Sequence, residues 1–161
     1  MLTKAQQQLA TEHLASPGLL KSELKLGREL GRAMQCIPCN WKFSRDGGAV
    51  GAINLKDENG DAVKIPAGFV VWDSAILVKT AVTSGGSATL AFAVESANDI
   101  KTAEAVATFS ADAIVAGIPV GTAASAVLCT AERTPTLTVA TAALIGGELD
   151  VMLIGFYQDR T

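Results

Sequence analysis

The stretch FVVWDSAILVKTAVTSGGSATLAFAVE, residues 69–95, indicates the fold class of this chain. A long run rich in apolar residues, Phe69 to Val82, is followed by Thr83-Ser84-Gly85-Gly86-Ser87 and by a second run, Ala88 to Glu95. Apolar and β-branched residues on both sides of a glycine-containing turn are typical of a β-hairpin. The pattern therefore predicts two strands that pair through this turn.

The same combination of strand and turn signals recurs on both sides of this stretch. Residues 41–45 lead into Asp46-Gly47-Gly48 and then into residues 49–55, which predicts another hairpin. Further strands are predicted at residues 125–131, 136–141 and 148–158, next to turns rich in Gly or Pro. The segment from Asn98 to Ala113 suits a short helix as well as irregular structure, so its assignment stays open.

The number and spacing of these strands define the expected architecture. About seven or eight strands joined mostly by short turns, without alternating long helices, are typical of an all-β fold, either an antiparallel β-sandwich or a jelly roll. A doubly wound nucleotide-binding fold does not fit this pattern. We expect two parts, a partly helical N-terminal arm at residues 1–39 and the β domain at residues 40–161.

The arm differs from the rest of the chain because it is rich in Gln, Lys, Glu and Leu. Thr3 is a candidate N-cap for a first helix that Ser16-Pro17-Gly18 would end, and Gly27 weakens a helix assignment for the second segment. Short isolated helices are marginal in water, so the leucines need a surface to cover them. The arm either packs on its own domain or reaches a neighbouring subunit. The candidate partner-binding residues are Leu9, Leu14, Leu19, Leu20, Leu24, Leu26 and Leu30.

Charge and hydropathy exclude several classes of partner. The 161 residues carry a formal net charge of -3, so no overall positive field attracts nucleic acid or an anionic membrane. Residues 113–131 have no charge, but Gly117, Pro119 and Gly121 interrupt them, which favours two buried strands over a membrane span. The polar N-terminus lacks the apolar run of a signal peptide, so we expect a protein made and used without export.

The motif Cys36-Ile37-Pro38-Cys39 is the main candidate for chemistry. A Cys-x-x-Cys pair supports disulfide exchange when it opens a helix within an alternating β and α pattern, whereas this pair is expected before a strand. A zinc site would have to combine the pair with Cys129 and His13, which lie far apart in the sequence. We expect a thiol pair without redox function, and no catalytic, cofactor-binding or metal-binding residues.

Two other groups of residues resemble functional motifs only in part. Asp57, Asn59 and Asp61 match the first ligands of a calcium loop, but the Gly and the bidentate Glu that such a loop requires are missing. An Asn-Gly turn is the expected structure there. Trp41 and Trp72 could offer flat faces to a sugar, but only 5% of the residues are aromatic, so core or interface packing is favoured for both.

Taken together, the strand and turn motifs resemble small virion proteins of tailed bacteriophages, including capsid cement or decoration proteins. The resemblance covers residues 41–157. The segments that carry it are Asp46-Gly47-Gly48-Ala49-Val50-Gly51 with Ile53-Asn54-Leu55, Ile65-Pro66-Ala67-Gly68, Thr83-Ser84-Gly85-Gly86-Ser87-Ala88-Thr89, Arg133-Thr134-Pro135-Thr136-Leu137-Thr138-Val139 and Gly146-Gly147-Glu148-Leu149-Asp150-Val151. The arm with Cys36 and Cys39 has no counterpart in that pattern.

This resemblance implies a structural protein without enzymatic activity. Its expected role is to stabilise the phage head from the capsid exterior by binding across subunits of the major capsid protein, after synthesis in the cytoplasm of the bacterial host. Such proteins form homo-oligomers, for which a trimer is favoured over a dimer. A neck, tail or fibre component is the alternative within the virion, and a carbohydrate-binding β-sandwich module is the alternative outside it.

Overall fold

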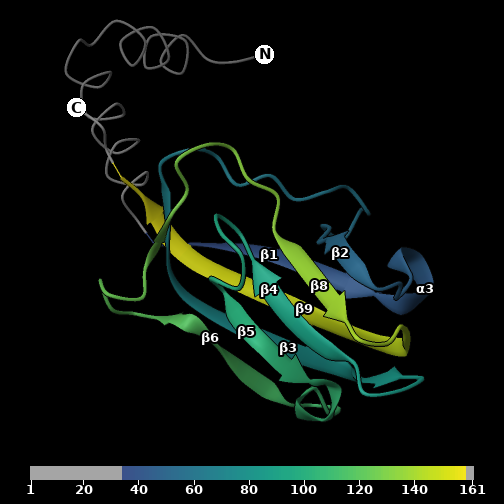
Figure 1. Ribbon diagram of the computed structural model, residues 1–161. Helices are drawn as coiled ribbons and strands as arrows, with labels where there is room; N and C mark the ends of the chain where they lie inside the picture. The colour runs from purple at the N-terminus through teal and green to yellow at the C-terminus, as the bar shows by residue number, and fades with distance from the viewer. Residues whose placement is uncertain (1–33, 159–161) are drawn as a thin grey trace, which may run out of the picture. The chain divides into compact units, whose positions relative to one another are not determined.

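The two longest strands of the molecule lie side by side and form the centre of one sheet. The computed structural model describes residues 34–158, in which β3 (Phe69–Ser84) pairs with β9 (Leu144–Tyr157) in antiparallel orientation (Figure 1). Buried and more exposed residues alternate along both strands, as expected when one face of a sheet covers a core. Val78, Val151 and Leu153 are among the residues that point into this core.

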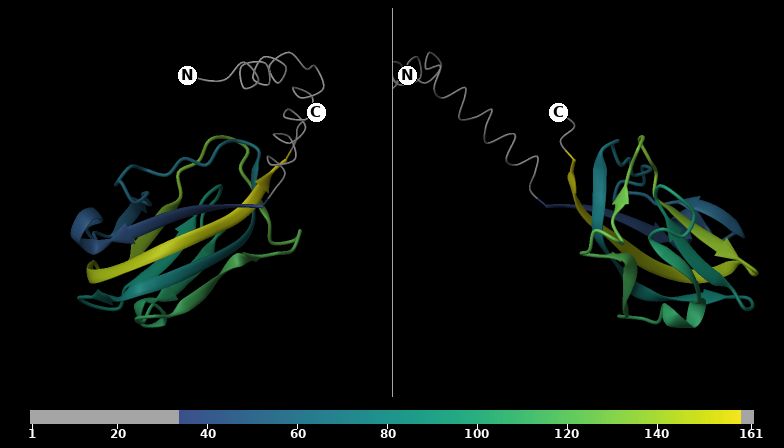
Figure 2. Two further views of the ribbon diagram at one scale, coloured as in Figure 1. Left: turned by 180° about the vertical axis from the view of Figure 1, so that it is seen from behind. Right: turned by 60° about the vertical axis from the view of Figure 1, so that its left-hand side comes forward.

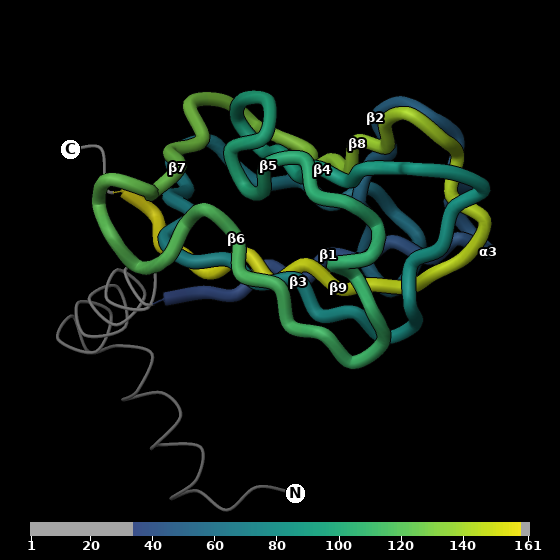
Figure 3. Tube along the Cα trace, turned by 60° about the horizontal axis from the view of Figure 1, so that its bottom comes forward, coloured from purple at the N-terminus to yellow at the C-terminus, as the bar shows by residue number. Residues whose placement is uncertain are grey.

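Two antiparallel sheets face each other across the core (Figures 2 and 3). The first sheet has the order β1-β9-β3-β6, with β7 paired to β3, and the second has the order β2-β8-β4-β5. The remaining elements are β1 (Gln35–Lys42), α3 (Phe43–Asp46), β2 (Gly51–Asn54), β4 (Thr89–Ala93), β5 (Lys101–Ala105), η1 (Val106–Thr108), β6 (Ile114–Val120), β7 (Val127–Leu128) and β8 (Thr136–Ala140).

The pairing of these strands is that of a jelly roll. Strand β1 pairs with β9, β2 with β8, β3 with β6 and β4 with β5, so the first half of the chain lies beside the second half in reverse order. A long hairpin wrapped into two facing sheets gives this arrangement. The expectation of an all-β antiparallel sandwich or jelly roll is confirmed, and the strand order identifies the jelly roll.

Both predicted hairpins are wrong. Strands β3 and β4, on the two sides of residues 85–88, belong to different sheets, and so do β1 and β2 on the two sides of residues 43–50. The glycine-containing segments do reverse or bend the chain, as their sequence indicates. Turn chemistry is local, however, and cannot distinguish a hairpin from a connection that crosses between sheets.

Several boundaries also differ from the expectation. Strand β1 begins at Gln35, whereas the arm was expected to extend to residue 39, so Cys36 and Cys39 lie inside this strand and not before it. A strand was expected at residues 41–45, but β1 ends at Lys42 and the short helix α3 follows it. The open segment 98–113 contains β5 and the 3-10 turn η1. The helices expected in the arm lie outside the described residues.

The uncharged segment 113–131 contains two strands, β6 and β7, as predicted, but the expectation that both are buried is wrong: β6 exposes alternate residues to solvent, and both residues of β7 are partly exposed. No helix within the described residues is long and apolar enough to cross a membrane. The core between the sheets has few aromatic side chains, in keeping with the composition. Its largest fully buried side chains are Trp41, Phe69, Phe92 and Phe109, together with Leu and Ile residues. The indole of Trp41 satisfies its N–H by donating to the carbonyl oxygen of Gly47 at 2.9 Å.

A group of ionic hydrogen bonds holds α3 against the end of β1. The Asp46 carboxylate, whose side chain is 1% exposed, accepts from Arg45 Nε at 2.9 Å, from the backbone N–H of Lys42 at 3.0 Å and from Lys56 Nζ at 2.9 Å. Burial alone would raise the pKa of Asp46, but the hydrogen bonds from Arg45, Lys56 and Lys42 lower it to about 2. The folded state therefore favours the ionised carboxylate.

This network predicts a pH-dependent contribution to stability. Because the folded-state pKa of Asp46 lies below its ordinary value of 3.8, the contribution is complete above that value and is lost as the pH falls through about 2. Asp46→Asn should lower the unfolding free energy at pH 7 by about 1.5–3 kcal/mol. It should also flatten the pH dependence between about pH 5 and 2. Urea unfolding at several pH values measures both effects, and equal slopes for the two proteins would contradict them.

The central pair of strands approaches closely at Gly155. A side-chain carbon at this position would collide with the carbonyl oxygen of Val70 and would lie 2.9 Å from a ring carbon of Phe69. A bulge in β3 between Val71 and Asp73 lies beside this point. Glycine is thus required here because only a hydrogen atom fits between β9 and β3.

Gly155→Ala should therefore lower the free energy of unfolding by about 1–3 kcal/mol through overpacking. The matched control is Gly85→Ala, because an added carbon at Gly85 meets no atom within 4 Å. Gly85→Ala should change stability by no more than about 0.5 kcal/mol or stabilise slightly. Chemical denaturation of both variants measures the difference, and similar values for the two would refute the close-approach explanation.

Candidate functional site

The face of the β1-β9-β3-β6 sheet that points away from the core carries an unusual number of apolar side chains. We call this surface the outer face. Its residues are the alternate positions of the four strands, and the strand registers arrange them in rows across the sheet. Read from β1 to β6, the rows are Cys36–Ile154–Asp73–Val120, Pro38–Met152–Ala75–Ala116 and Asn40–Asp150–Leu77–Ile114.

The rows are mostly apolar from one edge of the sheet to the other. Met152, Ile154 and Leu77 in the centre are partly exposed. Cross-strand neighbours on one face of a sheet lie about 4.5–5.5 Å apart, so these side chains form a continuous surface and not scattered contacts. Contiguous apolar areas on the surface of a folded protein are typical of interaction sites.

Strand β6 is the most exposed part of the outer face. Ile114 is 75% exposed, Val120 54% and Ile118 37%. These residues alternate with Val115 and Pro119, which are buried on the inner side. The strand has no charged residue along its whole length, so an edge strand of this sheet presents apolar side chains directly to solvent.

The two ends of the outer face have different chemistry. At one end Trp72, next to the bulge in β3, packs against Phe156 with ring centroids 5.9 Å apart. At the other end Lys79 contacts Asp150 at 2.7 Å and Glu148 at 3.7 Å, and Lys42 contacts Glu148 at 3.0 Å. The two lysines and two carboxylates have equal and opposite charge. At this end the apolar rows therefore border a group of ion pairs with no net charge.

The free edge of β1 is protected against pairing with another strand. Asn40 exchanges both backbone hydrogen bonds with Lys56, at 2.7 and 3.0 Å, so its backbone groups point away from β9. Pro38 lies two residues earlier with the same orientation and has no N–H to donate. Proline at such an edge position is a known protection against strand addition. The edge of β1 is thus closed to strand addition at these two positions.

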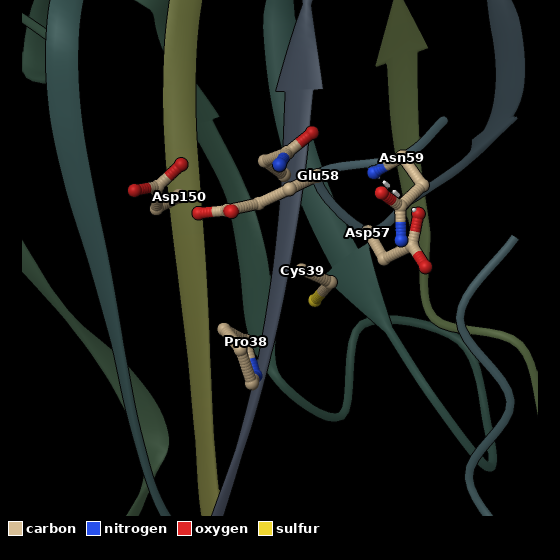
Figure 4. Close-up of a pocket in the computed structure, with 7 residues that line it drawn as sticks. Pro38, Cys39, Asp57, Glu58, Asn59 and Asp150 are labelled. Carbon is tan, nitrogen blue, oxygen red and sulfur yellow. Dashed lines mark hydrogen bonds between the residues drawn. The ribbon is translucent and has the colours of Figure 1, made fainter. Parts of the chain in front are cut away.

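A hollow of about 260 Å³ lies where β1 meets the turn at residues 57–61 (Figure 4). Pro38, Cys39, Asp57, Glu58 and Asp150 are among the residues that line it. Within residues 34–158 no group of three or more acidic, His or Cys side chains has the geometry to hold a metal ion. Asp150 is also paired with Lys79. The hollow therefore offers no ligand set for a cation.

The residues that partly matched a calcium loop stabilise a turn. The Asp57 carboxylate accepts hydrogen bonds from the backbone N–H groups of Asn59 and Asp61, both at 2.9 Å. The backbone N–H of Gly60 donates to the Asp57 carbonyl oxygen at 3.2 Å. The hydrogen bonds lower the pKa of Asp57, the one from the Asp61 backbone most strongly. The expected turn is confirmed, and the Asp57 carboxylate accepts hydrogen bonds from backbone groups of the turn itself.

The strand geometry separates the two thiols of the Cys-x-x-Cys motif. Residues three apart in a strand point to opposite faces, and accordingly Cys36 is exposed on the outer face while Cys39 is buried in the core. Burial raises the pKa of Cys39 to about 12, with a smaller contribution from Asp150, and its thiol donates to the Val151 carbonyl oxygen at 3.4 Å. Burial also raises the pKa of Cys36. Disulfide exchange requires the opposite, a lowered thiol pKa.

The remaining predicted residues fall in different places. Cys129 is buried, and burial raises its pKa to about 11, so it resembles a core residue more than a metal ligand. Trp41 is fully buried, which confirms core packing and excludes it as a platform for a sugar. Trp72 is partly exposed on the outer face. His13 and the seven arm leucines lie outside the described residues.

Sequence reasoning missed the outer face, although its signal is present in the sequence. The segment Val151-Met152-Leu153-Ile154 is apolar at every position, where a strand with one solvent-facing side would alternate. Ile114-Val115-Ala116 shows the same pattern in β6. Such runs indicate strands that are covered on both faces. In the described residues only the inner face of these strands is covered.

Comparison with known proteins supports the fold. A chain from the capsid of Ralstonia phage GP4 superimposes with a TM-score of 0.51 over 78% of this chain and 86% of that chain, at 17% sequence identity. No family model matches the sequence, and no curated protein matches it either. At this level of identity the similarity concerns the fold: the chain belongs to the class of antiparallel two-sheet β domains that this capsid chain also represents.

The thiol environments predict which cysteines react in the folded protein. Iodoacetamide at pH 7.5 should alkylate Cys36 alone and slowly, because the other two thiols are buried and protonated. In denaturant all three should react at similar rates. Mass spectrometry of the intact protein counts the modified sites, and Cys36→Ser should leave no site that is modified in the native state. Alkylation of Cys39 in the native state would contradict the buried environment.

Proposed function

We propose that this chain is a structural protein of a tailed-phage virion, and more specifically a cement or decoration protein that stabilises the head. In this proposal it lies on the capsid exterior and binds across neighbouring subunits of the major capsid protein. It acts as a homo-oligomer, with a trimer favoured over a dimer. It performs no catalysis, and its role is to hold other subunits together.

The observation that carries the proposal is the apolar outer face on a jelly-roll domain. Such a face costs free energy in water and is expected to be covered in the working assembly. The fold is shared with a chain from the capsid of a Ralstonia phage. Two of the three thiols, those of Cys39 and Cys129, are buried with raised pKa values, and the Asp150 carboxylate is paired with Lys79. Assembly accounts for these features together.

The arm leucines, Leu9, Leu14, Leu19, Leu20, Leu24, Leu26 and Leu30, belong to the same proposal as partner-binding residues. A cement protein gains strength from several weak contacts made at once. When the subunits of one oligomer each contact a different capsid subunit, the second and later contacts form at a high effective concentration. Modest apolar surfaces then suffice for lasting attachment.

The direct test is the number of copies of this chain in each purified particle of the phage that encodes it. Quantitative mass spectrometry with isotope-labelled peptides, measured against the major capsid protein, gives the ratio. A cement protein should be present in a number comparable to that of the major capsid protein. A handful of copies would assign the chain to the neck, tail or fibres and reject the cement role. Absence from particles would reject the virion proposal altogether.

A further inference from the structure

We infer that the outer face of the β1-β9-β3-β6 sheet binds the leucine-rich N-terminal segment, residues 1–33, of a neighbouring copy of this chain. The inference goes beyond the proposed function because it concerns how copies of the chain join each other. It needs no capsid partner and can fail or hold independently of one.

The first step is what the outer face requires of a ligand. Its rows cross four strands, a width of about 15 Å at the usual strand spacing. The ligand must supply several aliphatic side chains over this width, above all at β6, where Ile114 and Val120 are mostly exposed. Asp73 is the single charged residue in its two most apolar rows, so the ligand needs few or no acidic groups.

The second step is that the chain itself contains a segment with this chemistry. Residues 1–33 include eight leucines and no Val, Ile or aromatic residue. A segment of this length cannot bury that many leucines by itself, because isolated short helices are marginal in water and have no core. The segment can therefore bury its leucines only against another apolar surface, and the outer face is such a surface.

The third step is the distribution of charge, which selects the segment over a second copy of the domain. Residues 34–158 contain seven Lys or Arg and twelve Asp or Glu, a net charge of -5, so two such domains repel each other. Residues 1–33 contain five Lys or Arg and three Glu, a net charge of +2. The segment is thus attracted to the domain, whereas face-to-face packing of two domains is opposed.

The fourth step is where the segment joins the domain. It leads into Gln35, the first residue of β1, and β1 is an edge strand of this same sheet. For its leucines to cover the face of their own copy, the chain would have to turn back over the sheet before it enters β1 at Gln35. A neighbouring copy needs no such reversal. Copies can exchange segments in a closed ring, reciprocally about a two-fold axis or in turn around a three-fold axis, so that each copy both gives and receives one segment.

The test uses full-length chains and surface substitutions that leave the core intact. The face variant combines Ile114→Asp and Val120→Asp. Its matched control combines Ile145→Asp and Val50→Asp, because these residues are the same types, are 59% and 57% exposed, and lie outside the rows of the outer face. The segment variant combines Leu20→Ser, Leu24→Ser and Leu26→Ser, with Gln6→Ser and Gln7→Ser as its control.

Sedimentation equilibrium measures self-association of each protein. The wild type and both controls should associate alike, while the face variant and the segment variant should each show a dissociation constant at least tenfold higher. Thermal unfolding checks that every variant is folded. If the face variant unfolds, Ile114→Thr with Val120→Thr replaces it, because these substitutions keep β-branched side chains suited to a strand.

Mixing the two defective proteins separates exchange between copies from other arrangements. The segment variant retains an intact face and the face variant retains an intact segment, so an equal mixture should form a one-to-one complex, seen by native mass spectrometry with one partner labelled with heavy isotopes. A monomeric wild type, an unaffected face variant or a mixture without complex would each overturn the inference. None of these results alters the copy number in particles, which tests the proposed function separately.

Discussion

The pairing of β3 with β9 is the contact on which the rest of this molecule depends. The two strands form the middle of one sheet, and their inner residues supply much of the core while their outer residues supply much of the apolar face. The same pair sets the close approach at Gly155 and the bulge near Trp72. Both the stability of the domain and the surface that it offers to partners therefore follow from one strand pair.

This arrangement also explains why a protein with few aromatic residues has a well-defined core. Fourteen residues of β9 and sixteen of β3 give a long ladder, and small or β-branched side chains pack closely between two sheets. The ionic network around Asp46 and the hydrogen bond from Trp41 hold the connection between the sheets at one end. Within residues 34–158 no element covers the other side of the long strands.

The all-β class, the two strands of the uncharged segment 113–131 and the turn at Asp57 could be predicted from the sequence, because each depends on local composition or turn chemistry. The partners of the strands could not. Gln35 pairs with Gly155 across almost the whole domain, and no local pattern encodes so distant a contact. The outer face was missed for a related reason, since apolar residues at every position of Val151–Ile154 are equally typical of a strand buried on both faces.

The pairing of β1 with β9 has a consequence for how the protein forms in the cell. The first described strand finds its partner only in the last one, so β1 cannot reach its final place until β9 has been synthesised and has left the ribosome. Contacts between such distant segments slow folding because a large loop must close before any of them forms. During that interval the apolar strands are open to wrong partners, and the yield of functional protein depends on the rate of synthesis and on chaperones as well as on the stability of the final fold.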